Sequence, residues 1–249
     1  MRKFWINRVF LAVGLTTGIL LSACTDTTGV GQSAADPYES QNRAIHAFNK
    51  SADRNVLKPA STAYAVVVPS PVRKGLSNGV SNLGQPVKFV NHVAQGDFDD
   101  AARTFLRFAV NSTFGLGGLL DPAADGGLYD RPTDFGETLA VWGVREGAYL
   151  ELPLLGPSSE RDLAGKVVDF AINPVRNFVE APESNYILAA QVLSVLQARH
   201  EYADIIDALL YESSDSYSAA RIAYLQNKAR AVGGQSVTED NLEDPYADF

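Results

Sequence analysis

The fold is decided by the longest helical pattern in the chain, PESNYILAAQVLSVLQARHEYADIIDALLYE at residues 182–212. Apolar side chains recur in it at helical spacing and form one main stripe, Leu188, Val192, Val195, Tyr202, Ile206 and Leu209. Four more side chains widen that stripe into a broad face, Leu193, Leu196, Ile205 and Leu210. A face this broad needs a large partner surface, which is either a protein core or lipid.

Helix signals recur on the N-terminal side of this segment. Asp36-Pro37 is typical of an N-cap followed by proline at the first helical position. Ser70-Pro71 predicts the start of a second helix, and Gly84 predicts its end. Both predicted helices carry apolar residues at helical spacing, with basic residues between those of the first.

The same kinds of start and end signal predict three more helices. Pro86 would begin a short helix that ends at Gly96, and Asp97 would cap the helix that follows. Near the other end of the chain, Ser214-Asp215 predicts a cap for a last helix that runs to Arg230. Most of the chain between residues 36 and 232 is therefore expected to be helical.

Strand signals are few. Residues 148–152 alternate between apolar and polar side chains, and Pro153 and Pro157 are expected to end this strand. No repeat with a period of about 20 to 50 residues is present. The predicted fold class is all-α with minimal β structure.

Two segments do not fit a plain helical bundle. Residues 114–122, FGLGGLLDP, and residues 152–157, LPLLGP, are apolar and rich in glycine or proline. Ordinary loops are polar because their backbone must be solvated or paired. These loops are therefore either buried in protein or placed in another apolar medium, and composition leaves both explanations open.

The N-terminus predicts export and lipid attachment. Arg2, Lys3 and Arg8 precede an apolar run over residues 9–21, which is short for a bilayer span of about 20 residues. The sequence Leu-Ser-Ala-Cys at residues 21–24 resembles the signal of bacterial lipoproteins, in which the cysteine is acylated and becomes the mature N-terminus. The alternative is an ordinary signal peptide cleaved after Ala23, which would leave Cys24 as a free thiol.

The remaining chain is expected to comprise a tether, a body and a tail. Residues 1–23 are the predicted signal peptide, residues 24–35 a flexible polar tether, and residues 36–232 the helical domain. Residues 233–249 are acidic and predicted to be disordered. Thr25 rather than aspartate follows Cys24, which under the bacterial sorting convention indicates the outer membrane.

Charge and cysteine content exclude several functions. The net charge is −8, and removal of the three basic residues of the signal peptide makes it −11. An acidic surface argues against nucleic acid as a partner. Cys24 is the only cysteine, so its acylation would leave no thiol for disulfides, metal binding or catalysis.

No catalytic constellation is recognisable. His200 and Asp204 lie one helical turn apart, which is more typical of a surface pair, and neither His46 nor His92 has a cysteine or a second histidine at metal-ligand spacing. Nucleophile-elbow and zinc-protease motifs are missing. We therefore expect a protein that is not an enzyme, without a cofactor or a bound metal.

Between residue 36 and residue 162 a series of segments matches the pattern of one known family almost continuously. The segments are Asp36-Pro37-Tyr38-Glu39, Asn42-Arg43, Phe48-Asn49, residues 67–73, residues 81–86, Phe89-Val90-Asn91, Gln95-Gly96, Arg107-Phe108, residues 111–118, Asp121-Pro122-Ala123, residues 134–139, Trp142-Gly143-Val144, residues 152–158 and Arg161-Asp162. On these residues the chain resembles the MlaA (VacJ) family of outer-membrane lipoproteins. One departure is Ser40-Gln41, where the family often has Gly-Phe. From about Val167 onward the chain matches only in helical character.

The resemblance implies a ring-like helical protein within the periplasmic leaflet of the outer membrane. Family members remove mislocalised phospholipid from the outer leaflet through an amphipathic channel and pass it to a soluble periplasmic carrier. Trimeric porins are their usual membrane partners. We hypothesise that one loop forms a flexible gate on the lipid path, namely Phe114, Gly115, Leu116, Gly117, Gly118 and Leu119.

Two other functions are compatible with the same sequence. A lipid hydrolase would need a nucleophile with a base, and no serine lies in a recognisable motif. A structural lipoprotein that scaffolds the envelope needs no channel, and the sequence does not show one.

Overall fold

The computed structural model describes residues 36–174, 177 and 179–233. The chain divides into two units, Met1–Pro37 and Tyr38–Phe249, and every described helix and strand belongs to the second. The helices are α2 (Glu39–Ala52), η1 (Asp53–Leu57), α3 (Lys58–Val67), α4 (Ser70–Gln95), α5 (Phe98–Thr113), α6 (Pro122–Asp125), α7 (Phe135–Val141), α8 (Glu160–Ile172), α10 (Glu183–Glu201), α11 (Ala203–Asp207), η2 (Ala208–Glu212) and α12 (Ser216–Gly233). The segments η1 and η2 are π-helices, and the two strands are β1 (Tyr149–Leu152) and β2 (Gly156–Ser159).

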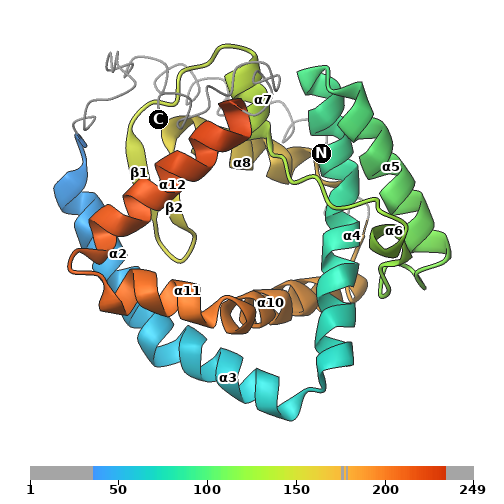
Figure 1. Cartoon of the computed structure of the whole chain (residues 1–249), viewed down its shortest axis with the longest axis horizontal. Coiled ribbons are helices and arrows are strands. Elements are labelled where there is room, and N and C mark those ends of the chain that lie inside the picture. The colour runs from blue at the N-terminus through green and yellow to red at the C-terminus, as the bar shows by residue number, and fades with distance from the viewer. Residues whose placement is uncertain (1–35, 175–176, 178, 234–249) are drawn as a thin grey trace, which may run out of the picture. The chain divides into compact units, whose positions relative to one another are not determined.

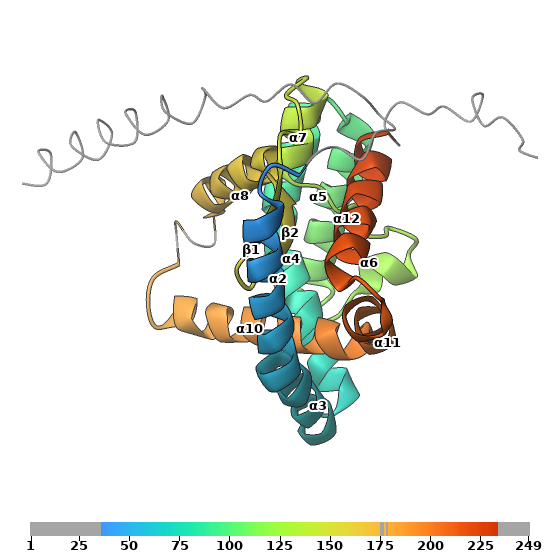
Figure 2. The same cartoon turned by 90° about the vertical axis from the view of Figure 1, so that its left-hand side faces the viewer.

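The helices of the second unit form a ring around an opening (Figure 1). Helix α4 forms one side, and α5 lies against its outer face. Helix α10 packs against both α3 and α4, while α7 packs against α8 at the opposite side of the opening. Figure 2 shows α12 and α8 on either side of the β1–β2 hairpin. The prediction of an all-α, ring-like domain with minimal β structure is confirmed.

Several helix boundaries follow from local sequence. Asp97 caps α5 by accepting a hydrogen bond from the Asp100 amide at 3.0 Å, as predicted. Gly96 ends α4 in the left-handed conformation, with φ +79°. Asp215 accepts hydrogen bonds from the Tyr217 and Ser218 amides at 3.1 and 3.2 Å, which confirms the predicted start of the last helix.

Three predicted helix boundaries are wrong, those at Gly84, Pro86 and Asp36. Helix α4 continues through Gly84 and Pro86, so the two helices expected there are one. An interior proline costs a helix about 3 kcal/mol because it removes a backbone donor. The packing of α4 against α5, α7 and α10 holds the helix together across this position. At the N-terminal end, α2 is capped at Tyr38 and begins at Glu39, so Asp36 is not its N-cap.

The long apolar pattern is also interrupted. Helix α10 ends at Glu201, and α11 and η2 continue the pattern after a break at Tyr202. The predicted strand is confirmed as β1, but Pro157 does not end it. Instead Pro157 lies in β2 opposite Glu151 in a two-stranded antiparallel hairpin. Proline is tolerated in this position because β2 is an edge strand.

Candidate functional site

The second unit has an unusual core. Its buried apolar side chains, among the described residues, are alanines and tyrosines only, Tyr64, Ala101, Ala123, Ala148, Tyr149, Tyr217 and Ala220. The buried polar or charged side chains are more numerous and include Asn42, His46, Asp53, Arg73, Gln85, Asn91, His92, Arg107, Glu151, Asp162 and Arg199. Soluble domains normally bury their large aliphatic side chains instead. The interior of this unit is therefore held mainly by polar contacts.

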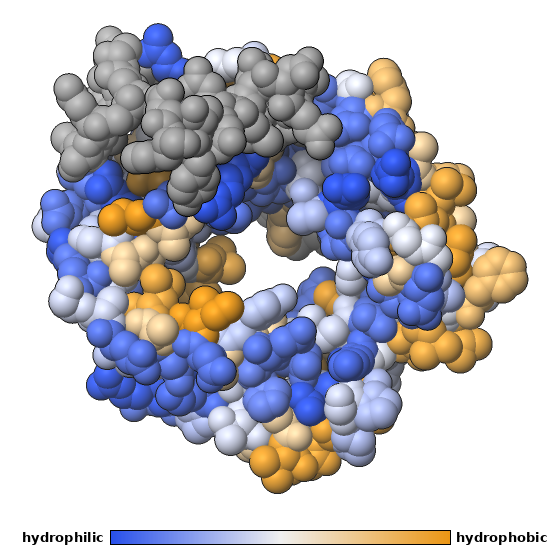
Figure 3. Space-filling view, viewed as in Figure 1, coloured by the Kyte–Doolittle hydropathy of each residue, from blue (hydrophilic) through white to orange (hydrophobic). Residues whose placement is uncertain are grey.

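Large apolar side chains lie on the surface instead. Ile205, Phe114 and Leu154 are 68, 78 and 73% exposed. Figure 3 shows such residues gathered on the outer edge of the unit as well as near its opening. No helix in the described part of the chain is long and apolar enough to cross a membrane. Extended apolar surface of this kind is typical of a protein that contacts lipid or other proteins.

The two apolar loops belong to this surface. Leu116 and Leu155 are exposed, as are Phe114 and Leu154. The explanation that these loops pass through the protein core is therefore wrong for their large side chains. The other explanation, an apolar medium outside the protein, fits their exposure.

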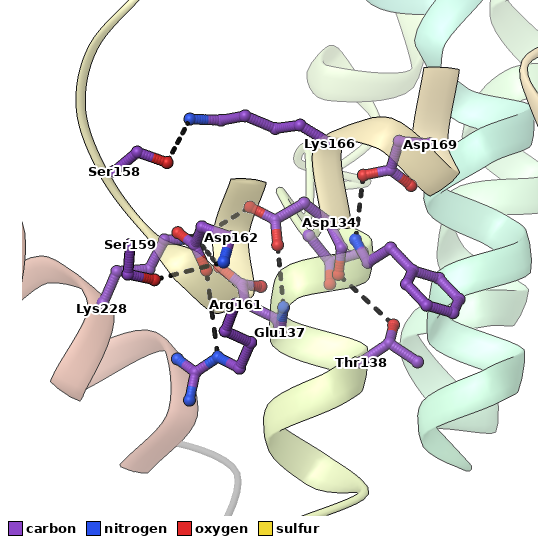
Figure 4. Close-up of polar contacts among 12 residues, drawn as sticks. Asp134, Glu137, Thr138, Ser158, Ser159, Arg161, Asp162, Lys166, Asp169 and Lys228 are labelled. Carbon is purple, nitrogen blue, oxygen red and sulfur yellow. Dashed lines mark hydrogen bonds and ion pairs between the residues drawn. The ribbon is translucent and has the colours of Figure 1, made fainter. Parts of the chain in front are cut away.

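One buried polar group joins α7, α8 and α12, and we call it the Lys228 cluster: Asp134, Glu137, Asp162 and Lys228 (Figure 4). The Lys228 ammonium lies 2.8 Å from Asp134 Oδ2, 3.2 Å from Glu137 Oε1 and 3.0 Å from Asp162 Oδ2. Burial by itself lowers the pKa of Lys228, but the pairs with Asp134 and Asp162 outweigh burial and raise this pKa above its ordinary value. The cluster connects the C-terminal part of α12 to the first turns of α7 and α8.

A second buried ion pair connects α10 to η1. The Arg199 guanidinium donates to both carboxylate oxygens of Asp53, at 2.7 and 2.9 Å, and to Asp207 at 2.6 Å. Tyr211 also donates to Asp53, at 2.6 Å. Burial by itself raises the pKa of Asp53, but these hydrogen bonds lower it below its ordinary value.

A cavity of about 640 Å³ lies between α2, η1, the hairpin, α10, α11, η2 and α12. Figure 3 shows the corresponding opening through the unit. The polar part of the cavity lining is His46, Asn49, Lys50, Asp53, Glu151, Arg199 and Asn227. The apolar part includes Leu57, Leu154, Val195, Ile206, Leu209 and Leu210. The cavity is therefore amphipathic and large enough for part of a molecule with a polar head and apolar chains.

The hairpin is fixed to α2 at the polar edge of the cavity. Asn42 donates to the Tyr149 carbonyl at 3.0 Å and accepts from the Glu151 amide at 2.9 Å. The Glu151 carboxylate accepts hydrogen bonds from the Tyr149 hydroxyl at 2.6 Å and from Asn49 at 3.2 Å. These residues could not be predicted as a site from the sequence, because the two asparagines lie more than a hundred positions from Tyr149 and Glu151.

A serine, a histidine and a glutamate come together beside this cavity. The Ser216 hydroxyl lies 3.1 Å from His46 Nε2, and His46 Nδ1 lies 3.4 Å from Glu151 Oε1. This hydrogen-bonded series of serine, histidine and glutamate resembles a catalytic triad. However, the Tyr217 and Ser218 amides, which could have stabilised an oxyanion, are bonded to Asp215. The chain of hydrogen bonds joins α12, α2 and β1.

The predicted gate loop packs against α4 and is not part of the cavity lining. Asn78 donates to the Leu119 carbonyl at 3.3 Å. A Cβ on Gly118 would lie 2.5 Å from Asn82 Cβ, so the loop backbone approaches α4 closely. Gly117, with φ +74°, has open space around it. The structure therefore places the loop beside α4, and none of its residues is among those that line the cavity.

Among the described residues, one group of three side chains could offer ligand atoms to a metal ion. His92, Asp97 and Asp100 offer ligand atoms within 4.8 Å of one another. Asp97 caps α5 with one oxygen, and Asp100 lies 3.4 Å from Arg131, which disfavours a further cation there. Cys24, the predicted lipid attachment site, lies outside the described residues.

The fold and the cavity define a class of protein: a helical ring with a polar interior, patches of large apolar side chains on its surface and an amphipathic cavity. The chain belongs to the MlaA lipoprotein family, whose model matches residues 34–231. The match extends well beyond Asp162 and so includes the C-terminal helices, which resembled the family in helical character alone.

Curated relatives and a solved structure agree with this assignment. The intermembrane phospholipid transport system lipoproteins MlaA of Shigella flexneri and Escherichia coli K12 are 36 and 35% identical over 236 residues, or 93% of this chain and 91% of each relative. An uncharacterized protein of Rickettsia typhi is 32% identical over 198 residues, 79% of this chain and 78% of that protein. A solved structure from work on the structural basis for maintenance of bacterial outer membrane lipid asymmetry is 32% identical, has a TM-score of 0.68, and aligns with 80% of this chain and 99% of its own.

Proposed function

We propose that the chain is an outer-membrane lipoprotein that removes mislocalised phospholipid from the outer leaflet and so maintains lipid asymmetry. The observation that carries this proposal is the amphipathic cavity within a ring that exposes many large apolar side chains. A phospholipid has a charged head and two apolar chains, so its path must present both kinds of surface. The names of the relatives, which refer to intermembrane phospholipid transport, support the same function.

The proposal includes the anchor. Signal peptidase removes residues 1–23, Cys24 is acylated, and residues 24–35 tether the helical domain of residues 36–232 to the periplasmic leaflet. Two or more acyl chains give stable anchoring, whereas one alone gives marginal membrane binding. Gly233 is the last residue of α12, and we propose that the acidic residues after it are a tail.

The proposal also includes the partners. The phospholipid passes to a soluble periplasmic carrier, and the apolar surface of the ring contacts a porin trimer. Transfer breaks and forms no covalent bond, so the protein is not an enzyme and needs no cofactor. The support for these partners is the family resemblance together with the exposed apolar side chains.

Filling the cavity tests transport directly. Ala223 on α12 is exposed and lines the cavity, whereas Ala229 on the same helix is exposed and does not. Ala223→Trp should block lipid passage and raise outer-leaflet phospholipid, measured by surface labelling of cells. Ala229→Trp, at equal protein level, should not. Equal lipid asymmetry in both variants would favour the alternative, a structural envelope lipoprotein without a lipid channel.

We also propose that Phe114, Gly115, Leu116, Gly117, Gly118 and Leu119 form a gate or rim that bends to admit lipid. Gly117 has a left-handed backbone and open surroundings, so a side chain there strains the backbone without a clash. Gly117→Val should raise outer-leaflet phospholipid at an unchanged protein level. Normal asymmetry in that variant would show that the loop is purely structural.

A further inference from the structure

Three cations surround one tyrosine at the edge of the cavity. Lys50, Arg54 and Lys58 lie one helical turn apart along α2, η1 and the start of α3. Their charged groups are 5.7, 5.0 and 5.2 Å from the centre of the Tyr211 ring. An aromatic ring attracts each cation, but the three cations repel one another.

Carboxylates compensate only part of this charge. We call the whole group the Tyr211 cluster: Lys50, Asp53, Arg54, Lys58, Arg199, Asp207 and Tyr211. Asp53 is paired with Arg199, and Asp207 lies 2.6 Å from Lys58 as well as from Arg199. Within the described ranges, neither Lys50 nor Arg54 has a carboxylate at ion-pair distance. Four cations and two carboxylates leave two positive charges in excess, in a chain whose net charge is −8.

Tyr211 does not remove this excess. Burial, followed by the hydrogen bond to Asp53, raises the pKa of Tyr211 to about 12, so its hydroxyl stays neutral and donates to Asp53. The Lys50 ammonium donates to the Ser216 hydroxyl at 3.2 Å, which is also a neutral group. The cluster therefore keeps an excess of positive charge, which a bound anion would compensate.

The position of the cluster indicates which anion. Lys50 is half-buried and lines the cavity, and Arg54, one turn further along, is exposed. The neighbours of Tyr211 in η2, Leu209 and Leu210, form part of the apolar cavity wall. A ligand at this place meets positive charge at one end and an apolar wall at the other.

We propose that Lys50 and Arg54 form a phosphate-binding subsite, which holds the phosphate of a glycerophospholipid while its acyl chains lie on the apolar wall. This inference rests on the proposed function, because it assigns the headgroup end of the same lipid path. Lysine and arginine both bind phosphate through charge-assisted hydrogen bonds. Free phosphate has the same head chemistry but would not use the adjoining apolar wall.

Lipid binding by the purified full-length lipoprotein in detergent micelles tests this subsite. The ligands are fluorescently labelled phosphatidylglycerol, phosphatidylethanolamine and a diacylglycerol with the same chains. We expect the wild type to bind both phospholipids about tenfold more tightly than diacylglycerol, because diacylglycerol lacks the phosphate that the two phospholipids offer to Lys50 and Arg54. Lys50→Met with Arg54→Met should remove this preference and leave the affinity for diacylglycerol unchanged.

Two control variants separate the subsite from general charge. Lys74→Met with Arg103→Met removes the same charge from an exposed position on α4 and a half-buried position on α5, and should keep the preference. Lys50→Arg with Arg54→Lys keeps both charges and should also keep it. Arg54→Met alone changes only an exposed side chain, so it folds, and it should reduce the preference about threefold.

The outcomes distinguish the subsite from the proposed function. Unchanged phospholipid affinity in both the double methionine variant and Arg54→Met would overturn the subsite and leave lipid binding intact. A wild type that binds neither phospholipid nor diacylglycerol would overturn the proposed function. The double methionine variant could lose affinity for inorganic phosphate and keep its affinity for phospholipid. In that case the site binds free phosphate and the lipid assignment is wrong.

Discussion

The Lys228 cluster and the Tyr211 cluster are both groups of charges at junctions between helices, but carboxylates outnumber cations in the first and cations outnumber carboxylates in the second. In the Lys228 cluster, one buried ammonium lies within 3.2 Å of three carboxylates. In the Tyr211 cluster, four cations share two carboxylates, and Arg54 is open to solvent whereas Lys50 and Lys58 are half-buried. In the first cluster the only cation is fully paired with carboxylates, whereas in the second Lys50 and Arg54 have donors left for a ligand.

This difference indicates which charges hold the fold and which act on a ligand. The unit buries few apolar side chains, so it must rely on clusters such as that of Lys228 to fix its helices to one another. Within the Tyr211 cluster, the Arg199–Asp53 pair has the same role, because both side chains are buried and bonded. Lys50 and Arg54 are the cations of this cluster that lack a carboxylate partner among the described residues.

The largest effect is expected from Lys228→Met. The substitution leaves three carboxylates close together without their cation, and loss of one partner from a buried charge group costs roughly 3–5 kcal/mol. Thermal unfolding in detergent should show this loss. Lys88→Met is the matched control, since Lys88 forms a more exposed pair with Asp130 and should cost about 1 kcal/mol or less. Similar stability of the two variants would contradict the structural role of the Lys228 cluster.

Elements whose signals are local could be predicted from the sequence. Asp97 and Asp215 cap helices through amides two or three residues away, and Gly96 ends α4 with its own backbone. Helix α4 could not be predicted whole, because its continuity past Pro86 depends on packing against helices distant in sequence. Strand β2 was missed for the same reason, since Pro157 is tolerated only at an edge that pairing with β1 creates.

The site was less predictable than the fold. Asp53 and Arg199 are 146 positions apart, and His46 and Ser216 are 170 apart. One signal was available: Arg199 interrupts the apolar pattern of residues 182–212, and a charge within such a pattern needs a buried partner. The spacing of Lys50, Arg54 and Lys58 also predicts one basic helix face, although solvated charges are commonly arranged in the same way.

A smaller effect, dependent on pH, is expected from Glu146→Gln near the Lys228 cluster. Burial raises the pKa of Glu146 above its ordinary value. An acid whose pKa is raised on folding contributes stability that is present below its unfolded pKa of about 4.5 and is lost as pH rises through the folded pKa. Glutamine stays neutral at every pH, so it removes this loss.

The measurement is the melting temperature of both proteins between pH 4 and pH 8. Glu146→Gln should melt about 2 °C higher than the wild type near pH 8, and the two should converge near pH 4. Burial also raises the pKa of Asp169, so the melting temperature of both proteins will still fall somewhat as the pH rises. A wild type that is more stable than the variant at high pH would show that Glu146 is a paired member of the cluster.

The smallest effect is expected from Ser216→Ala beside the Tyr211 cluster. The Ser216 hydroxyl bonds both His46 and Lys50, and loss of such bonds costs about 1 kcal/mol. If Ser216, His46 and Glu151 only join α12, α2 and β1, the variant should melt slightly lower and keep normal lipid asymmetry. Purified protein with labelled phospholipid should release no fatty acid in either form. Fatty-acid release by the wild type but not by Ser216→Ala would show that the three residues are a hydrolase triad, and the cavity would then be a site of chemistry as well as a path.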